Sequence, residues 1–183
     1  MRLVPFSIVC IVLLGTMGCQ PTGPADNTLN AENLEKSLLE ALITAEDGDL
    51  INLPEGQFEF QRPLSLDGVP NVTIKGAGKG KTILSFKGQI EGAEGLIIKN
   101  SDNLLLEGFT LADTKGDALK VQKCDGVVIR DLETTWTGGA LSTNGGYGLY
   151  PVNCKNVLME NCEASYASDA GIYVGQTTNF IVR

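Results

Sequence analysis

The sequence predicts an all-β protein: a parallel β-helix whose coils each contribute three short strands, preceded by one amphipathic helix that covers the first coil. Two observations predict this fold. Apolar residues recur in fixed columns along residues 64–183, although the coils vary from 23 to 32 residues in length. The segments between them are rich in Asn, Gly, Asp, Ser and Lys. Constant strands joined by loops of variable length indicate a repeat architecture.

The columns place three strands in every coil. Apolar residues follow the first column after eight, ten and thirteen positions. These segments are too short for helices and carry Val, Ile and Leu at alternate positions, which favours strands over the helical return segment of a leucine-rich repeat. One coil cannot bury its inward residues alone, so neighbouring coils have to stack. The first column consists of Leu64, Leu96, Leu119, Leu149 and Ile172.

A further column, just before the second strand of each coil, holds Asn103, Gly126, Asn156 and Asn179. Asn and Gly tolerate the left-handed backbone conformation that a tight corner requires. This column therefore predicts one sharp turn per coil.

The N-terminal segment, residues 1–18, has the pattern of a signal peptide, with Arg2 followed by a short apolar stretch. The sequence from Thr16 to Cys19 resembles a bacterial lipobox, in which Cys19 is the lipidation site, although lipoboxes usually carry Leu where Thr16 stands. A simple secretory signal is the alternative. Residues 19–29 predict a flexible tether. We expect an exported cell-envelope protein that contacts the membrane through a lipid anchor only.

The repeat domain is expected to span residues 30–183. It opens with a predicted helix over 31–43, with Asn30 as N-cap and Leu34, Leu38 and Leu42 on one face. Its polar face carries mostly Glu, which favours covering the first coil over lying on a membrane surface. Arg183 lies midway through a coil, so we expect the domain to continue in a longer protein.

Two stretches, GDLINLPEGQFEF (48–60) and NVTIKGAGKGKTIL (71–84), resemble the pectin-lyase-like superfamily of right-handed parallel β-helix proteins. The resemblance covers about residues 31–183 and includes bacterial β-helix repeat lipoproteins of unassigned role. This resemblance implies that the β-helix is right-handed. It leaves the activity open, because that superfamily holds polysaccharide lyases, glycoside hydrolases, epimerases and non-catalytic proteins. The Gly-His-Gly motif of its polygalacturonases and the Asp-Pro-His-Glu motif of its alginate epimerases are absent.

Composition excludes several functions. The chain has no histidine, which removes Ser-His-Asp hydrolysis and imidazole zinc sites. Its net charge of −8 argues against nucleic acid, whose phosphates need a basic surface. The glycine-rich segment 76–82 lacks the spacing of a phosphate-binding loop and leads into a predicted strand.

Cys124 and Cys154 share a column with Ser101 and Thr177. A disulfide between the two cysteines is one interpretation. We favour a ladder of small buried side chains, because in-register neighbours ~4.8 Å apart direct their side chains the same way.

The third strand offers two stacked carboxylates, Glu133 and Glu163, with Asp131 nearby. Carboxylates ~5 Å apart share a proton, bind a cation or pair with a base, and the spacing suits a retaining glycosidase. Asp131, Glu133 and Glu163 are therefore candidate Ca²⁺ ligands, and the two glutamates candidate catalytic residues. Solvated surface glutamates are the alternative.

A 30-residue coil exceeds its neighbours by seven residues, and the extra residues lie in the segment 136–147, which suggests a second site. Trp136, Tyr147, Tyr150 and Tyr173 are candidate substrate-binding residues, because aromatic faces pack against sugar C–H groups. Asp117 and Asp169, two coils apart at roughly 10 Å, are a candidate pair for an inverting glycosidase.

Two outward columns carry a charge pattern and an apolar stripe. Alternating charges at Glu107, Arg130, Glu160 and Arg183 predict a ladder of ion pairs. Beside it lies an apolar stripe, which is either covered by a loop or contacts a protein partner: Leu105, Val128, Leu158 and Ile181. The function that we expect is polysaccharide binding or processing along the solenoid, and the alternative is a non-catalytic envelope scaffold.

Overall fold

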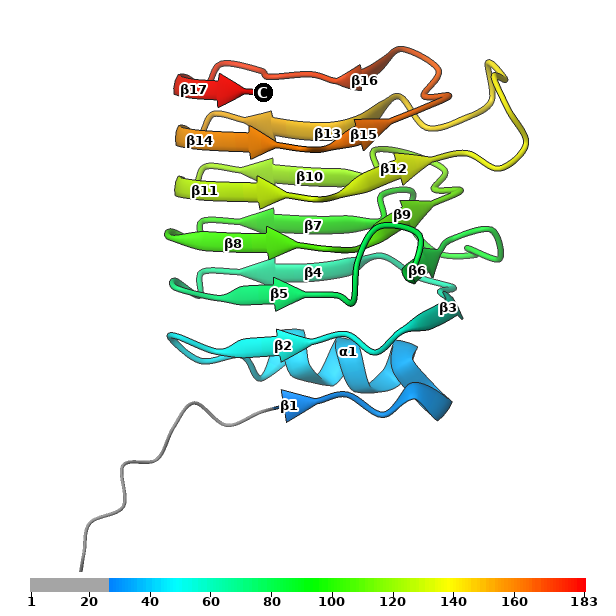
Figure 1. Ribbon diagram of the computed structural model, residues 1–183, viewed down its shortest axis with the longest axis horizontal. Helices are drawn as coiled ribbons and strands as arrows, with labels where there is room; N and C mark the ends of the chain where they lie inside the picture. Colours follow the sequence, from blue (N-terminus) through cyan, green and yellow to red (C-terminus); the bar gives the residue numbers. More distant parts are fainter. Residues whose placement is uncertain (1–26) are drawn as a thin grey trace, which may run out of the picture.

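Stacked β-coils make up the computed structural model, which describes residues 27–183 (Figure 1). The predicted signal peptide, the lipidation site at Cys19 and most of the 19–29 tether lie outside the described residues. All strand pairs are parallel, and four coils each contribute one strand to each of three sheets, which confirms the predicted all-β parallel β-helix.

Sheet A has the order β1 (Asn27–Thr28), β2 (Leu50–Asn52), β5 (Thr73–Lys75), β8 (Leu104–Glu107), β11 (Asp125–Arg130), β14 (Lys155–Glu160) and β17 (Thr178–Val182). Sheet B has the order β3 (Gly56–Glu59), β6 (Thr82–Ser85), β9 (Thr110–Ala112), β12 (Glu133–Thr135) and β15 (Glu163–Ala164). Sheet C has the order β4 (Leu64–Asp67), β7 (Leu96–Lys99), β10 (Leu119–Gln122), β13 (Tyr147–Val152) and β16 (Ala170–Ile172).

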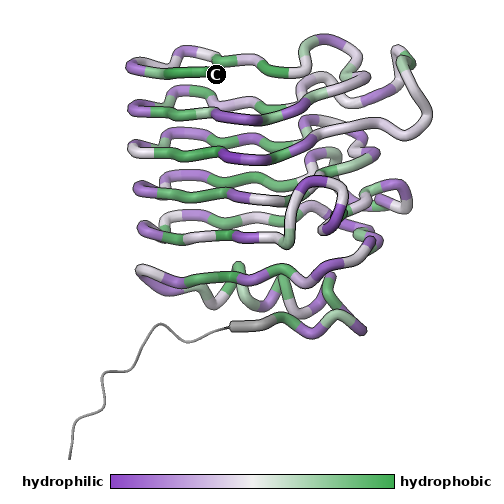
Figure 2. Tube along the Cα trace, viewed as in Figure 1, coloured by the Kyte–Doolittle hydropathy of each residue, from purple (hydrophilic) through white to green (hydrophobic). Residues whose placement is uncertain are grey.

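The predicted register is confirmed. The first column runs through sheet C, with Leu64 beside Leu96, Leu96 beside Leu119, Leu119 beside Leu149, and Leu149 beside Ile172. We number the coils from the one that β4 begins, so that β16 and β17 belong to the fifth. Inward residues of all three sheets form one continuous apolar core, while hydrophilic residues gather at the turns (Figure 2).

The predicted helix covers the first coil, but it starts later than the sequence suggested. Residues Ala31–Asn33 form a 3-10 turn capped by Asn30, and α1 (Leu34–Ile43) begins after Asn33, whose side chain accepts from the Lys36 N–H. A second capping residue three positions on thus shifts the helix start. Leu34, Leu38 and Leu42 are buried under the stack as predicted. None of the helices among residues 27–183 could cross a membrane.

Asparagine and glycine close the predicted corner of each coil. Asn71, Asn103, Gly126, Asn156 and Asn179 all have φ between 51° and 75°, the left-handed region. The glycine-rich segment 76–81 leads into strand β6, as predicted, so it lacks the following helix that a phosphate-binding loop needs.

The small side chains before the second strand form a hydrogen-bonded ladder. The N–H of Ser101 donates to Cys124 Sγ (3.4 Å), and the N–H of Cys154 donates to Thr177 Oγ1 (3.3 Å). Each of the four side chains also donates to the carbonyl oxygen two residues earlier, at 2.9 to 3.4 Å. Both cysteines are free thiols, so the predicted ladder is confirmed over the disulfide.

Candidate functional site

Aromatic and charged side chains gather on the outer surface of sheet C, in the third to fifth coils. The ring centroids of Tyr147, Tyr150 and Tyr173 lie 4.8 to 5.3 Å from one another. Two of the three pairs are stacked with interplanar angles of 25° and 30°. With the charged side chains around them, these rings form what we call the tyrosine cluster: Asp117, Lys120, Tyr147, Tyr150, Asp169 and Tyr173.

Strand register assembles the tyrosine cluster. Lys120 on β10 pairs with Tyr150 on β13, and Tyr173 follows β16 in the same outward column. Tyr147 opens β13, immediately after the long loop. Since parallel neighbours stand ~4.8 Å apart, side chains of one column stack directly on each other. The fold therefore fixes these rings without help from a flexible loop.

Charged groups flank the rings and are paired within the cluster. Lys120 Nζ lies 3.2 Å from Asp117 Oδ2 and 5.1 Å from the centroid of the Tyr150 ring, a cation–π contact. The hydrogen bond from the Tyr147 hydroxyl to Asp169, together with the charge of that carboxylate, raises the pKa of Tyr147 above its ordinary value. The Tyr147 hydroxyl is therefore protonated at neutral pH.

The cluster is open to solvent in part. Tyr173 is 42% exposed, and Tyr147 and Tyr150 are half-buried. The structure thus brings together five of the side chains that the sequence singled out, namely three tyrosines and two aspartates. Sequence reasoning missed Lys120, although its place in the column of Tyr150 and Tyr173 was readable from the register.

Trp136 is not part of this surface, which corrects its predicted role in sugar stacking. Its side chain is 3% exposed and its indole N–H donates to the Thr114 carbonyl oxygen at 2.7 Å. The ring therefore belongs to the core and anchors the start of the 136–147 loop. That loop projects beside the stack between β12 and β13 (Figure 1). The Asn144 amide holds it by donating to the carbonyl oxygens of Gly139 and Tyr166.

The second predicted site lies on sheet B, where Glu133 and Glu163 are in register as expected. Glu133 accepts a hydrogen bond from the Thr110 hydroxyl (2.8 Å), and Glu163 pairs with Lys79 Nζ (2.6 Å). Asp131 instead accepts from the Asn161 amide. Within residues 27–183, no three acidic or cysteine side chains come together in a group that could hold a metal ion, so the three candidate ligands are not assembled.

The predicted charge ladder is present and extends one coil further. Ion pairs join Lys75 to Glu107, Glu107 to Arg130, and Arg130 to Glu160, which also contacts Arg183. The hydrogen bonds from Arg130 and Arg183 lower the pKa of Glu160 below its ordinary value. This ladder fixes the register of sheet A on its outer face.

The apolar stripe beside this ladder faces outward as expected. Leu105, Val128 and Leu158 are half-buried, and Ile181 is 56% exposed. Binding of a protein partner on this stripe stays a prediction.

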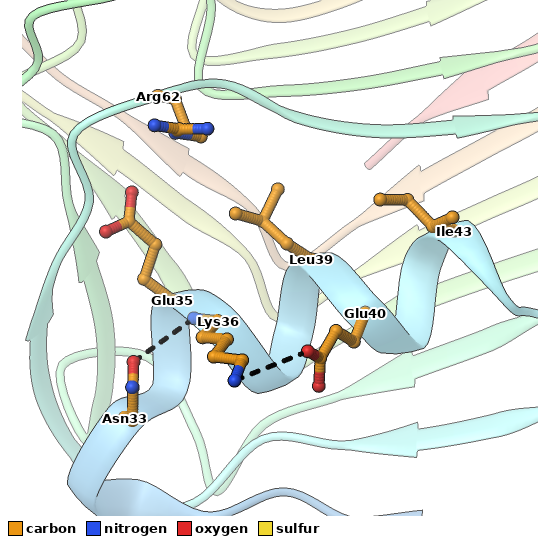
Figure 3. A pocket seen from close by; sticks show the side chains of 7 residues that line it. All are labelled: Asn33, Glu35, Lys36, Leu39, Glu40, Ile43 and Arg62. Carbon is orange, nitrogen blue, oxygen red and sulfur yellow. Dashed lines mark hydrogen bonds and ion pairs between the residues drawn. The ribbon is translucent and has the colours of Figure 1, made fainter.

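A separate shallow pocket of about 270 Å³ lies on the outer side of α1 (Figure 3). Its lining combines apolar Leu39 and Ile43 with Lys36 and Glu40, which form an ion pair at 3.8 Å. The Glu35 carboxylate at its rim accepts from the Gln61 N–H at 2.7 Å. Arg62, which also lines the pocket, pairs with Glu91 at 3.5 Å. The bond of Glu35 to Gln61 ties α1 to the segment between β3 and β4.

Comparison with known proteins agrees with this architecture. Residues 71–183 match the family model described as the right handed beta helix region. A solved structure from Parabacteroides merdae, described provisionally as a glycosyl hydrolase, is 17% identical and covers 75% of each chain with a TM-score of 0.53. A pectin methylesterase mutant in complex with a hexasaccharide is 17% identical, with a TM-score of 0.45 over 72% of this chain and 52% of its own. No curated protein matches the sequence significantly.

Proposed function

Because the chain belongs to the family of right-handed β-helix proteins, we propose that it binds a polysaccharide along sheet C, on the tyrosine cluster. The observation that carries this proposal is the group of three rings with centroids 4.8 to 5.3 Å apart on an open sheet face. A solenoid offers a long regular surface, which suits a linear polymer.

The chemistry of the cluster suits a sugar. Tyrosine rings present an apolar surface to sugar C–H groups and a hydroxyl that can donate or accept. Asp117, Lys120 and Asp169 around the rings supply acceptors and a donor for sugar hydroxyls. The rings pack on each other, so the surface is ordered before a ligand arrives and binding costs little conformational entropy. The neighbour described as a glycosyl hydrolase supports a carbohydrate as the ligand.

The pairing of the carboxylates favours binding over cleavage. Asp117 pairs with Lys120 at 3.2 Å, and Asp169 accepts a hydrogen bond from the Tyr147 hydroxyl. A glycosidase needs two carboxyl groups that flank the scissile bond, whereas these two are engaged within the cluster. The catalytic roles expected for the pair Asp117 and Asp169, and for Glu133 and Glu163, stay predictions. Export through residues 1–18 and lipidation at Cys19 also remain part of the proposal, and they would place this surface outside the cytoplasm.

A glycan array tests the proposal. The mature protein should bind a subset of polysaccharides, and Tyr150→Ala should lose that binding because it removes a ring that contacts both other tyrosines and Lys120. Tyr166→Ala is the matched control: Tyr166 is 53% exposed and lies outside the cluster. Silence of the wild type across neutral and acidic glycans would refute the proposal and leave the envelope scaffold as the better explanation.

A further inference from the structure

The glycine-rich loop of residues 76–81 does not turn directly from β5 into β6. It rises along the outside of the stack, in front of the second coil (Figure 1). Three of its amides attach it to the second coil, and the first of them is the N–H of Gly76, which donates to the Glu107 carbonyl oxygen (2.9 Å). The N–H of Gly78 donates to the Gly108 carbonyl oxygen (2.7 Å), and the N–H of Gly80 donates to Thr110 Oγ1 (2.9 Å). These bonds hold the loop backbone against the second coil, and those of Gly78 and Gly80 lie on either side of Lys79 in the sequence.

Its tip reaches much further. Lys79 Nζ lies 2.6 Å from Glu163 Oε1 and 3.0 Å from the Asn161 carbonyl oxygen. Lys79 belongs to the first coil and Glu163 to the fourth, so this contact passes over two intervening coils, or ~14 Å of stack. The Lys79 side chain is 21% exposed and that of Glu163 is 68% exposed. One ion pair therefore fastens the tip of the loop at the solvent boundary.

The loop is linked to both glutamates of sheet B. The Thr110 hydroxyl that accepts from Gly80 donates in turn to Glu133 Oε2 at 2.8 Å. A pocket of about 410 Å³ lies beside the loop, and its lining includes Lys75, Lys79, Glu107 and Asp131. In this position of the loop, Glu163 forms an ion pair with Lys79, and Glu133 is linked to the loop through the Thr110 hydroxyl. The loop in this position therefore engages both carboxylates.

We propose that residues 76–81 form a strap that closes reversibly over the Glu133–Glu163 edge of sheet B, and that breaking the Lys79–Glu163 ion pair opens it. Ion pairs at the surface are individually weak and are screened by salt, so this fastening opens readily. Gly76 is packed closely against Gly108 and anchors the base of the loop, whereas the looser packing around Gly78 and Gly80 lets the part that carries Lys79 move. The strand ladders of β12 and β15 do not depend on the strap, so opening leaves the coils intact.

Amide hydrogen exchange of the mature protein tests the strap. In Lys79→Met, the amides of Gly78 and Gly80 should exchange about fivefold faster. This factor corresponds to the loss of one of the stronger surface ion pairs. Glu163→Gln should do the same from the other side of the contact. Lys81→Met is the matched control, because Lys81 is in the same loop with an exposed side chain and no ion pair among the described contacts. It should stay within twofold of wild type.

Carbodiimide labelling provides the second readout. Glu133 and Glu163 should react faster in Lys79→Met than in Lys81→Met, and 1 M NaCl should accelerate labelling of the wild type. The proposal is overturned if Lys79→Met leaves strap exchange and labelling unchanged, or if Lys81→Met matches it. It is also overturned if exchange accelerates equally in β12 and β15, since the contact would then hold the coils and not the strap.

Discussion

Thr134 offers the sharpest test of how the core is packed. It lies in β12 between Leu111 of β9 and Ala164 of β15, and its side chain is fully buried. Its hydroxyl oxygen has no hydrogen-bond partner among the described residues. A buried hydroxyl without a partner costs about 1–3 kcal/mol of stability. We therefore predict that Thr134→Val stabilises the protein.

The structure limits the size of the gain. Valine replaces the hydroxyl with a methyl group of similar shape, but the site is tight: a Cβ built on Gly148 would lie 2.4 Å from Thr134 Oγ1. Crowding offsets part of the recovered desolvation energy. We expect a net gain of about 1 kcal/mol, which corresponds to a rise in Tm of about 2–4 °C for a domain of this size. Urea and thermal unfolding of both proteins measure it.

Two controls separate polarity from packing. Thr134→Ser keeps the unpartnered hydroxyl and removes a methyl group, so it should lose about 1 kcal/mol. Thr134→Ala removes both and leaves a cavity, so it should fall below Thr134→Val. If Thr134→Val is less stable than wild type while Thr134→Ser is not, the hydroxyl has a partner that stabilises it and the reasoning is refuted.

Three further predictions concern the ladders and the loop. The free energy of unfolding of Cys124→Ser should lie within about 0.5 kcal/mol of wild type, because serine can still accept a hydrogen bond from the buried Ser101 N–H, whereas Cys124→Ala should lose about 1–2 kcal/mol. Equal free energies of unfolding in urea for the two variants would contradict the ladder. Gly145→Ala should destabilise by more than about 2 kcal/mol, because its Cβ would lie 1.8 Å from the Gly116 carbonyl oxygen and 2.8 Å from the Trp136 ring; a Tm close to wild type would contradict the packing of the loop. The hydrogen bonds that lower the pKa of Glu160 from its ordinary value of 4.5 stabilise the fold above pH 4.5, and this stabilisation is lost as the pH falls through the lower pKa of the folded state. Glu160→Gln should therefore flatten the decline of Tm below about pH 4.5. An unchanged decline of Tm at acid pH would contradict this.

The register of the fold was readable from the sequence, because stacked coils turn a local pattern into a spatial one. The first column, the corner asparagines and the cysteine ladder needed only fixed spacing. The same logic placed Tyr173 beside Tyr150 and Glu133 beside Glu163. Each of these contacts joins neighbouring coils, so the period of the sequence defines it.

What could not be predicted lies in the loops, where the period is lost. Trp136 looked available because it begins the longest loop, yet its ring fills the space under Gly145. The contact of Lys79 with Glu163 joins the first coil to the fourth and leaves no trace in the column pattern. The spacing of polar residues in a loop does not predict the path of its backbone. The contacts of Trp136 and Lys79 depend on that path.

Affinity for a bound glycan tests the central claim most directly. Isothermal titration of a glycan selected on the array should give a Kd at least about tenfold weaker for Tyr150→Ala than for wild type, as expected for an aromatic anchor at the centre of a binding surface. Tyr166→Ala should stay within about twofold. An unchanged Kd in Tyr150→Ala, or an equal loss in Tyr166→Ala, would contradict binding at the tyrosine cluster.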